Sequence, residues 1–312
     1  MARTDDDSWD ITESVGATAL RVAAARAAET RSANRLINDP YAQLFLEAAG
    51  DGMWSADDPL DQTGKDPQLS AIEHVRVGYT ASRTKFFDDF FVAAVNSGVR
   101  QAVILAAGLD ARAWRLPWPE GAIVYEIDLP KVLQFKTATL KAHHANPRAQ
   151  CVAVPIDLRH DWPKALRQAG FDPSRATAWA AEGLLPYLPA HAQDQVFDHI
   201  HALSATESRL AVEAFDEAFF DPAYLERHLA LRQQYAAGVA QPGQTTPDNA
   251  ELWYLQERTN VADWLSAHGW SVNATPAHDL MAQNHRLPPT DAQDAIPKII
   301  FIDSRLTANA AR

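Results

Sequence analysis

A strand, a turn of small residues, a second strand and an acid follow one another within residues 101–129, and this order limits the possible folds most strongly. The apolar run 102–107 is rich in Val and Ile and is too short for a typical helix. The turn runs to Gly108, and a second apolar run, 122–127, leads directly to Asp128. Nucleotide-binding α/β domains begin in this way, so the stretch predicts a nucleotide site.

The turn departs from the usual glycine pattern at two positions. Gly108 lets the backbone approach a ligand closely, but Ala106 and Ala111 stand where the pattern has glycine. The link to the second strand is short and holds two prolines, which predicts a brief helical turn over 111–116 instead of a full crossover helix. Asp128, about twenty residues after the turn, is placed to accept hydrogen bonds from both ribose hydroxyls.

Charge and cysteine content exclude several classes of protein. The formal net charge of −12 argues against sequence-independent binding of nucleic acid and against an anionic membrane surface. Runs of about 18 apolar residues, which would predict a transmembrane helix, do not occur. Cys151 is the only cysteine, so neither an internal disulfide nor a cysteine-based zinc site is expected. Neither HExxH nor another metal-ligand spacing occurs, and we expect a cytoplasmic protein with no metal and no nucleic-acid or membrane partner.

Helical spacing of small and apolar residues predicts three helices before the first strand, over 14–34, 40–48 and 70–95. Asp39 is expected to cap the second of them. The acidic segment 1–12 is typical of a disordered tail. These helices form either a packed cover over a ligand site or a separate subdomain. Because no flexible linker separates them from the first strand, we interpret residues 13–98 as the cover.

Five further short apolar runs alternate with helical segments after the second strand. They lie at 151–157, 177–185, 209–215, 270–275 and 298–302. This alternation predicts the α/β class, with a mostly parallel seven-stranded sheet and helices on both faces. We expect one domain over 13–312, in which residues 99–216 form the cofactor-binding core. The segment 217–260 is interpreted as an irregular, aromatic-rich insertion on the acceptor side, and 261–312 as the C-terminal helix and strands.

Acids follow three successive predicted strands, namely Asp128, Asp157 and Glu182. Each acid alone has an ordinary interpretation as a helix cap or a loop carboxylate. Ligands of open parallel sheets bind beyond the carboxyl ends of the strands, so the three acids are expected in one crevice. Asp157, with the backbone of Leu158, suits the amine edge of adenine, and Glu182 suits a cationic amino group. This acidic rim favours S-adenosylmethionine over a pyrophosphate-bearing dinucleotide, because a carboxylate repels phosphate.

Four blocks of sequence and two segments of the N-terminal helices resemble the leucine carboxyl methyltransferase-like family, in particular its actinobacterial branch of S-adenosylmethionine-dependent methyltransferases. The blocks are LAAGLDARAWRLPWP, YEIDLPKVLQFK, PIDLR and AWAAEGLLPYLP, and the helical segments are NDPYAQLF and SRTKFFDDFF. The family turn reads G-x-G-x-D-x-R. Gly108, Asp110 and Arg112 match it, and Ala106 replaces the first glycine.

The resemblance implies a Rossmann-like class I methyltransferase fold, an enzyme, and S-adenosyl-L-methionine as cofactor. It also implies that Asp110 and Arg112 pair to brace the turn. Without the resemblance, Arg83 would be interpreted as a surface arginine on an amphipathic helix; with it, Arg83 is expected to hold the methionine carboxylate. The cofactor-binding residues that it implies are Arg83, Ala106, Gly108, Asp110, Asp128, Leu129, Asp157, Leu158 and Glu182.

The methyl acceptor is expected to be a small molecule with a carboxylate or a hydroxyl group. Tyr187, in the loop after Glu182, is the expected acceptor-side contact. No histidine lies in a recognisable catalytic pattern, so the sequence identifies no general base, and it specifies no oligomeric state. Two alternatives stay open, an NAD-dependent oxidoreductase with the same strand, turn and acid, and a non-catalytic cofactor-binding protein on the same fold.

Overall fold

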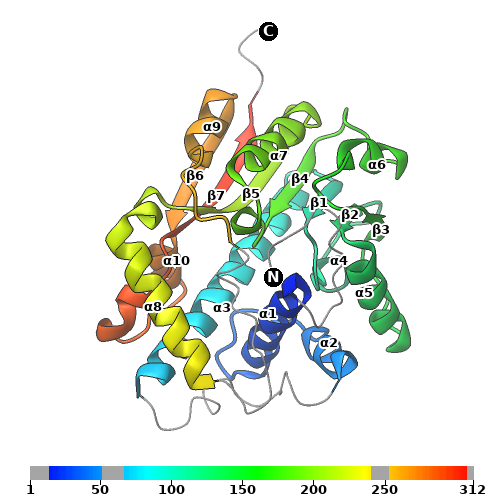
Figure 1. Ribbon diagram of the computed structural model, residues 1–312. Coiled ribbons are helices and arrows are strands. Elements are labelled where there is room, and N and C mark those ends of the chain that lie inside the picture. Colours follow the sequence, from blue (N-terminus) through cyan, green and yellow to red (C-terminus); the bar gives the residue numbers. More distant parts are fainter. Residues whose placement is uncertain (1–13, 51–66, 240–252, 308–312) are drawn as a thin grey trace. The chain divides into compact units, whose positions relative to one another are not determined.

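The computed structural model describes residues 14–50, 67–239 and 253–307 (Figure 1). Its helices and strands, in chain order, are α1 (Ser14–Arg31), α2 (Ala42–Ala49), α3 (Pro67–Asn96), β1 (Gln101–Leu105), α4 (Arg112–Arg115), β2 (Ile123–Asp128), α5 (Pro130–Ala142), β3 (Gln150–Pro155), α6 (Trp162–Gln168), β4 (Thr177–Ala181), the 3-10 helix η2 (Leu185–Tyr187), α7 (Ala190–Ala202), β5 (Arg209–Phe215), η3 (Glu217–Phe220), α8 (Pro222–Val239), α9 (Val261–Ala267), β6 (Trp270–Pro276), α10 (Ala277–Gln283), η5 (Thr290–Ala295) and β7 (Ile299–Leu306).

The chain divides into two compact units, each built from three segments. We call the first the helical unit, because α1, α2, most of α3, α8 and α10 lie in it; its segments are Met1–Lys85, Asp216–Trp253 and Pro276–Ile299. The second is the sheet unit, whose segments are Phe86–Phe215, Tyr254–Thr275 and Ile300–Arg312.

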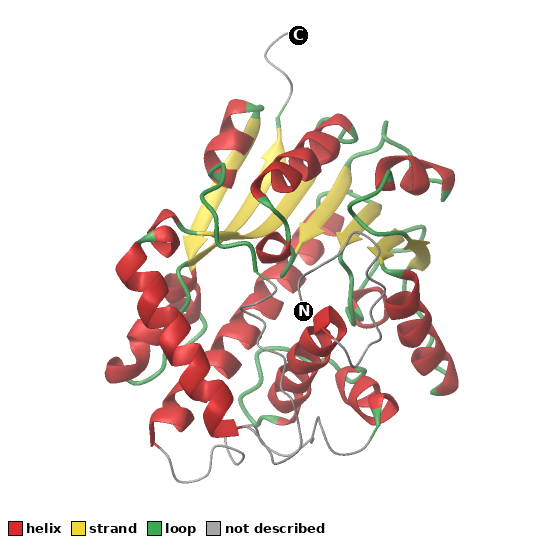
Figure 2. Cartoon of the chain, in the orientation of Figure 1, coloured by secondary structure: helices red, strands yellow, loops and turns green. Residues whose placement is uncertain are grey.

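The seven strands form one sheet in the order β3-β2-β1-β4-β5-β7-β6 (Figure 2). β1 pairs in parallel with both β2 and β4, and β2–β3 and β4–β5 are also parallel. β7 runs antiparallel to β5, since the amide of Leu306 donates to the carbonyl of Ser208 at 2.8 Å, and that of Asp216 to Lys298 at 3.0 Å. The strand order reverses between β1 and β4, which is where ligands of such sheets bind.

Alternating residues of the central strands face opposite sides of the sheet. Val103, Leu105 and Trp179 belong to one apolar core together with side chains from α6, α7 and α9. The alternate positions of these strands face the other side of the sheet, where the ring centroids of Phe86 on α3 and Phe301 on β7 lie 5.2 Å apart. All five residues of β1 are buried, as both faces of this central strand are covered.

All seven predicted strands are present, and the helical turn expected over 111–116 is confirmed as α4. The interpretation of the insertion as irregular is wrong in its described part, which forms η3 and the 18-residue helix α8. Asp221 accepts a hydrogen bond from the amide of Tyr224 at 2.9 Å, and Pro222 occupies the first helical position, so a cap and a favourable first turn start α8. The short helix α10 was not predicted.

Two predictions lie wholly or partly outside the described residues, namely the disordered tail over 1–12 and the middle of the insertion. The roles given to the segments 13–98, 99–216, 217–260 and 261–312 stay predictions. Among the described helices, none combines the length and apolar character that a membrane crossing requires.

Candidate cofactor site

The turn after β1 is built from two residues in the left-handed region, Ala106 and Gly108, each with φ of 49°. It is fastened to its neighbour β2, because the amide of Ala107 donates to the carbonyl of Ile127 at 3.0 Å. The amide of Asp110 then donates back to the carbonyl of Ala107 at 2.8 Å and closes the turn. Glycine adopts this conformation freely, whereas alanine pays a steric cost for it.

Replacing Ala106 by glycine is therefore expected to stabilise the protein, by about 0.5–1 kcal/mol after the greater entropy of glycine in the unfolded chain is deducted. Urea unfolding measures the change. Ala107→Gly is the matched control, because Ala107 is buried and has no positive φ, and it is expected to destabilise by about 1 kcal/mol. Equal effects of the two substitutions would contradict a strained Ala106.

Asp128, the last residue of β2, holds the turn from the side. Its Oδ2 accepts a hydrogen bond from the amide of Gly108, and its Oδ1 accepts one from the amide of Leu129, both at 2.6 Å. Burial raises the pKa of Asp128 above its ordinary value, although the two amides oppose this shift. Each carboxylate oxygen has more than one acceptor position, so the group can hold the turn and still accept ribose hydroxyls.

Asp157 lies two residues after β3, next to the end of β2. The register pairs Asp128 with Pro155, and the negative charge of Asp157 contributes to the raised pKa of Asp128, so the two carboxylates lie near one another. Asp157 accepts hydrogen bonds from the Arg159 amide at 2.8 Å and from its Nη2 at 2.7 Å. Burial alone would raise the pKa of Asp157, but Arg159 outweighs it and the pKa is lowered. Leu158 is half-buried against the apolar core of the sheet unit.

Glu182 follows β4 directly, and its carboxylate is bound within the protein. Its Oε2 lies 2.7 Å from Nη1 of Arg112. The next residue, Gly183, has φ of 62° and donates its amide to Oε2 of the buried Glu213 on β5 at 2.7 Å. The tip of β4 is therefore anchored to the turn after β1 through Arg112, and to β5 through Glu213.

Arg112 at the start of α4 is the centre of an ion-pair network in the sheet unit. Its guanidinium pairs with Asp110, with Glu182 and with Asp88 on α3, and its Nε lies 2.7 Å from Oδ1 of Asp88. Arg115 also binds Asp88, at 2.6 Å from Nη1 to Oδ2. Burial alone would lower the pKa of Arg112, and the three carboxylates overcome this and hold it well above its usual range. The expected pairing of Asp110 with Arg112 is confirmed.

A buried lysine also binds the turn after β1. Lys136 on α5 is fully buried, its Nζ lies 2.8 Å from Oε2 of Glu126 on β2, and it donates to the carbonyl of Asp110 at 3.1 Å. The same ammonium lies 5.9 Å from the ring centroid of Trp114. Three side chains therefore bind the turn after β1, namely Asp128, Arg112 and Lys136.

Arg83 and Tyr187 are two further residues that the sequence predicts for the site. Arg83 is on α3 in the helical unit, where it is half-buried and its guanidinium lies 6.0 Å from the ring centroid of Tyr79. Tyr187 is the last residue of η2, half-buried in the sheet unit. Their contacts with cofactor and acceptor stay predictions.

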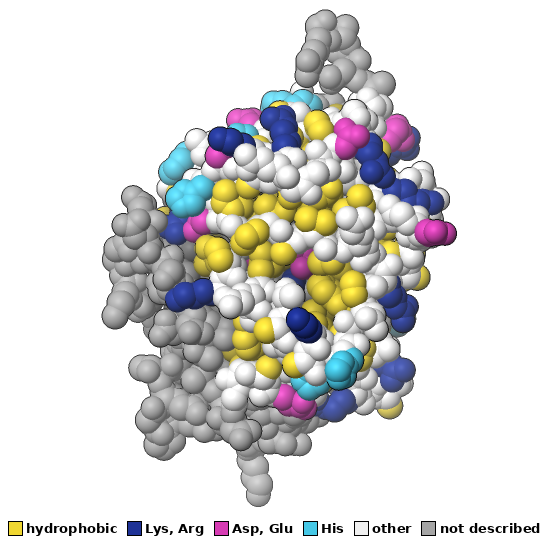
Figure 3. Space-filling view, turned by 90° about the vertical axis from the view of Figure 1, so that its right-hand side faces the viewer, with side chains coloured by type: hydrophobic (Ala, Val, Ile, Leu, Met, Phe, Trp, Pro, Cys, Tyr) yellow, Lys and Arg dark blue, Asp and Glu magenta, His cyan; other side chains and the backbone are white. Residues whose placement is uncertain are grey.

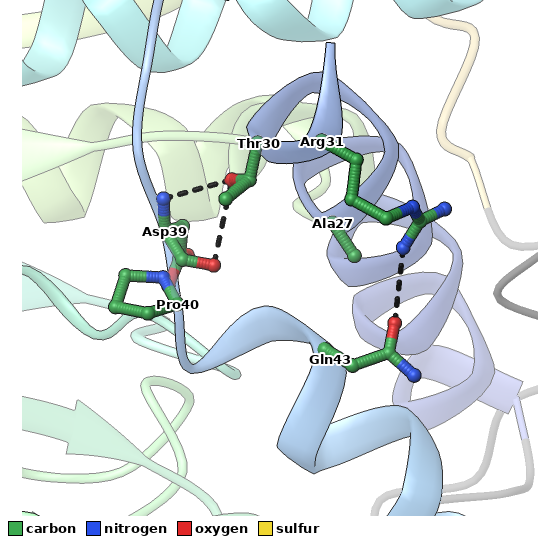
Figure 4. A pocket seen from close by; sticks show the side chains of 6 residues that line it. All are labelled: Ala27, Thr30, Arg31, Asp39, Pro40 and Gln43. Carbon is green, nitrogen blue, oxygen red and sulfur yellow. Dashed lines mark hydrogen bonds between the residues drawn. The ribbon is translucent and has the colours of Figure 1, made fainter.

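A cavity of about 270 Å³ lies between α1 and α2 in the helical unit (Figure 4). Arg31 donates to Oε1 of Gln43 at 3.1 Å, and Thr30 accepts from the amide of Asp39 at 2.8 Å. Asp39 also forms an ion pair with Arg26 at 2.9 Å and caps the start of α2, as predicted. The polar side chains of this cavity are bound to one another, and nothing in it indicates a ligand.

Charges of both signs are interspersed on the face of the molecule that Figure 3 shows, with hydrophobic side chains gathered between them. Nucleic-acid-binding proteins typically carry a patch or stripe of Lys and Arg. Lysine and arginine side chains form no continuous stripe on this face. Across the described residues, no group of three or more His, Cys, Asp and Glu side chains is arranged to hold a metal ion.

The sheet order, the antiparallel β7 and the acids around the turn define a class I methyltransferase fold. The family model for leucine carboxyl methyltransferase matches residues 19–201. This chain therefore belongs to the leucine carboxyl methyltransferase family, which confirms the expected class of enzyme and the cofactor that the class uses.

Full-length relatives come from mycobacteria. A protein of Mycolicibacterium paratuberculosis named "Putative S-adenosyl-L-methionine-dependent methyltransferase" is 54% identical over 313 residues, which covers 98% of each chain. A protein of the same name from Mycobacterium tuberculosis is 52% identical over 310 residues, 98% of this chain and 99% of the relative. Among solved structures, a DUF574 family protein from Streptomyces avermitilis matches with a TM-score of 0.50 at 14% identity, over 84% of this chain and 95% of that one, and supports the fold alone.

Several residues of the site were not singled out from the sequence. They are Asp88, Arg115, Glu126, Lys136 and Glu213, and each acts through a contact that the sequence does not signal. Their partners lie between 10 and 30 positions away along the chain.

Proposed function

We propose that this chain is an S-adenosyl-L-methionine-dependent methyltransferase that methylates an oxygen atom of a small molecule, either a carboxylate or a hydroxyl. The observation that carries the proposal is Asp128, whose carboxylate binds the Gly108 and Leu129 amides at the point where the strand order reverses. An acidic chain with one cysteine supports a cytoplasmic location.

The residues present fit this cofactor. Gly108 has no side chain to obstruct an approaching ligand, and Asp128 is partly exposed with acceptor positions left for two hydroxyls. Asp157 and Leu158 would hold the adenine, and Glu182 and Arg83 the two charged groups of the methionine part. When bound, the cofactor supplies a methyl group on a positively charged sulfur.

Methyl transfer to oxygen is an in-line displacement, so the protein must align the acceptor oxygen with the methyl carbon at about 3 Å. A carboxylate acceptor is ionised at neutral pH and needs no base, whereas a hydroxyl acceptor needs a base within hydrogen-bond reach. We assign no side chain to that role. The proposal therefore covers both kinds of acceptor, with Tyr187 proposed as a contact on the acceptor side.

Cofactor affinity is expected to fall on acidification. Ribose hydroxyls donate to the ionised form of Asp128, and burial raises the pKa of this group, so its protonation and the loss of affinity begin above the ordinary pH range of an aspartate. Asp157 has a lowered pKa, so it stays ionised to a lower pH than Asp128 does. Calorimetric titration with S-adenosylhomocysteine between pH 4 and 8 checks this. Affinity that is unchanged, or that rises towards low pH, would contradict the assignment.

Two measurements test the proposed function. Calorimetry with S-adenosylmethionine and S-adenosylhomocysteine establishes whether the wild-type protein binds the cofactor, and absence of heat with both would end the proposal. A screen of small carboxylic acids and phenols with a methyl-labelled donor then looks for a labelled product. Binding without transfer to any acceptor would favour a non-catalytic cofactor-binding protein. Quenching of the tryptophan fluorescence by NADH but not by S-adenosylhomocysteine would favour an oxidoreductase.

A further inference from the structure

Arg112 links three segments of the sheet unit that are distant in the sequence. Its guanidinium binds Asp88 in the C-terminal third of α3, Asp110 in the turn after β1 and Glu182 directly after β4. Only 3% of Arg112 is exposed, and the carboxylates of Asp88 and Glu182 are each 13% exposed. Of these partners, Glu182 is the one at the carboxyl end of a strand beside the topological switch point.

We propose that Arg112 is a positioning residue that orients the carboxylate of Glu182 toward the ammonium group of S-adenosylmethionine. The inference rests on the proposed function, because it needs the cofactor to bind above the turn. Arg112 itself acts through Glu182 and touches no part of the cofactor.

The geometry favours an arginine at this position over any other cation. Nη1 serves both Asp110 and Glu182, and Nε serves Asp88, so three carboxylates are fixed by one planar group. Lysine presents a single point charge and cannot hold three carboxylates in fixed directions. Because Arg112 is anchored to Asp88 and Asp110 independently, the position of its third partner, Glu182, is set before the cofactor arrives.

A pair of ligands separates this role from a general effect on the fold. S-adenosylhomocysteine carries the ammonium group, and 5′-methylthioadenosine shares its adenosine and sulfur but lacks the amino-acid part. For Glu182→Gln we expect the Kd of S-adenosylhomocysteine to rise about tenfold, and that of methylthioadenosine to change less than about twofold. Arg112→Lys also loosens the turn after β1, so we expect both Kd values to rise, that of S-adenosylhomocysteine about threefold more than that of methylthioadenosine. In the double variant the ratio of the two Kd values is expected to equal that of Glu182→Gln, because the two residues act on the ammonium group as one unit.

The matched control is Arg209→Lys. Arg209 pairs with Asp303 at 2.8 Å in the same unit, and it stands opposite Ala178 at the start of β4, the end of the sheet away from the site. Its Kd for both ligands is expected to equal that of the wild type. An equal fold-rise in the Kd of both ligands in Arg112→Lys would overturn the proposal. So would a double variant in which the rise of the Kd ratio is the product of the rises in the two single variants.

A second variant keeps the test decisive if Arg112→Lys does not fold. Asp88→Asn loosens the anchor of Arg112 and leaves Asp110 and Glu182 intact, and we expect the ratio of the two Kd values to rise about threefold. An unchanged ratio would contradict the proposal. Wild-type protein that binds neither ligand would defeat the proposed function itself, whereas wild-type binding without a change of ratio in the variants would defeat only the role of Arg112.

Discussion

Replacing Lys136 by methionine is expected to reduce the free energy of unfolding by about 3–5 kcal/mol, because the substitution leaves Glu126 buried without its cation. Neither side chain reaches solvent, and the ammonium also binds the carbonyl of Asp110. Burial already raises the pKa of Glu126 while Lys136 is present. Without Lys136, which lowers this pKa, burial would raise it further and the charged form of Glu126 would be unstable in the interior. Urea unfolding at pH 7, followed by circular dichroism, measures the loss.

Two further variants define the cause of that loss. Lys141→Met changes an exposed lysine on the same helix, and it is expected to alter the stability by less than about 0.5 kcal/mol. Combining Lys136→Met with Glu126→Leu removes both charges, and it is expected to restore most of the stability, since a buried ion pair is often replaceable by apolar side chains. A loss below about 1 kcal/mol in Lys136→Met would show that Glu126 does not depend on this lysine.

Replacing Asp128 by alanine is expected to weaken binding of S-adenosylhomocysteine by a factor of about 100 or more. The variant loses the acceptor of both ribose hydroxyls, and it also releases the Gly108 amide that the carboxylate holds at 2.6 Å. Asp128→Asn keeps one acceptor oxygen, so its affinity for S-adenosylhomocysteine is expected to lie between that of the wild type and that of Asp128→Ala. Calorimetry gives the affinities, and thermal unfolding without ligand shows how far the fold itself is affected.

Asp303→Asn serves as the control for Asp128. Asp303 is a carboxylate of the same sheet, on β7, where it binds Arg209 and its pKa is likewise raised by burial. Its substitution is expected to leave cofactor affinity unchanged. An Asp128→Ala protein that still binds within about threefold of the wild type would remove the basis of the proposed site.

The parts of the fold that depend on local patterns were predictable. Short runs of Val, Ile and Ala indicated the seven strands, and the prolines after Arg115 indicated that only a short helix joins β1 to β2. The proximity of Asp128 and Asp157 followed from a general rule, since neighbouring parallel strands bring their ends together. These inferences needed only residue type and spacing.

The contacts beneath the turn were not predictable, because burial of a charge depends on what the rest of the chain places opposite it. Lys136 stands in the helix PKVLQFKTATLKA, where a lysine is ordinarily solvent-exposed. It is buried only because Glu126 faces it from β2. Helix α8 differs from Lys136, because its start has a local signal in the capping residue Asp221 and in Pro222 at the first helical position.

The helical unit has a consequence for biosynthesis, because its parts are far apart along the chain. Arg286 pairs with Glu29 at 3.0 Å, and the backbone of α3 at Gly78 lies so close to Arg286 that an added Cβ would stand 2.7 Å from its carbonyl oxygen. A nascent chain can make these contacts only after residue 286 has left the ribosome. Helices α1 and α3 must therefore remain without these partners until the chain has been synthesised past residue 286.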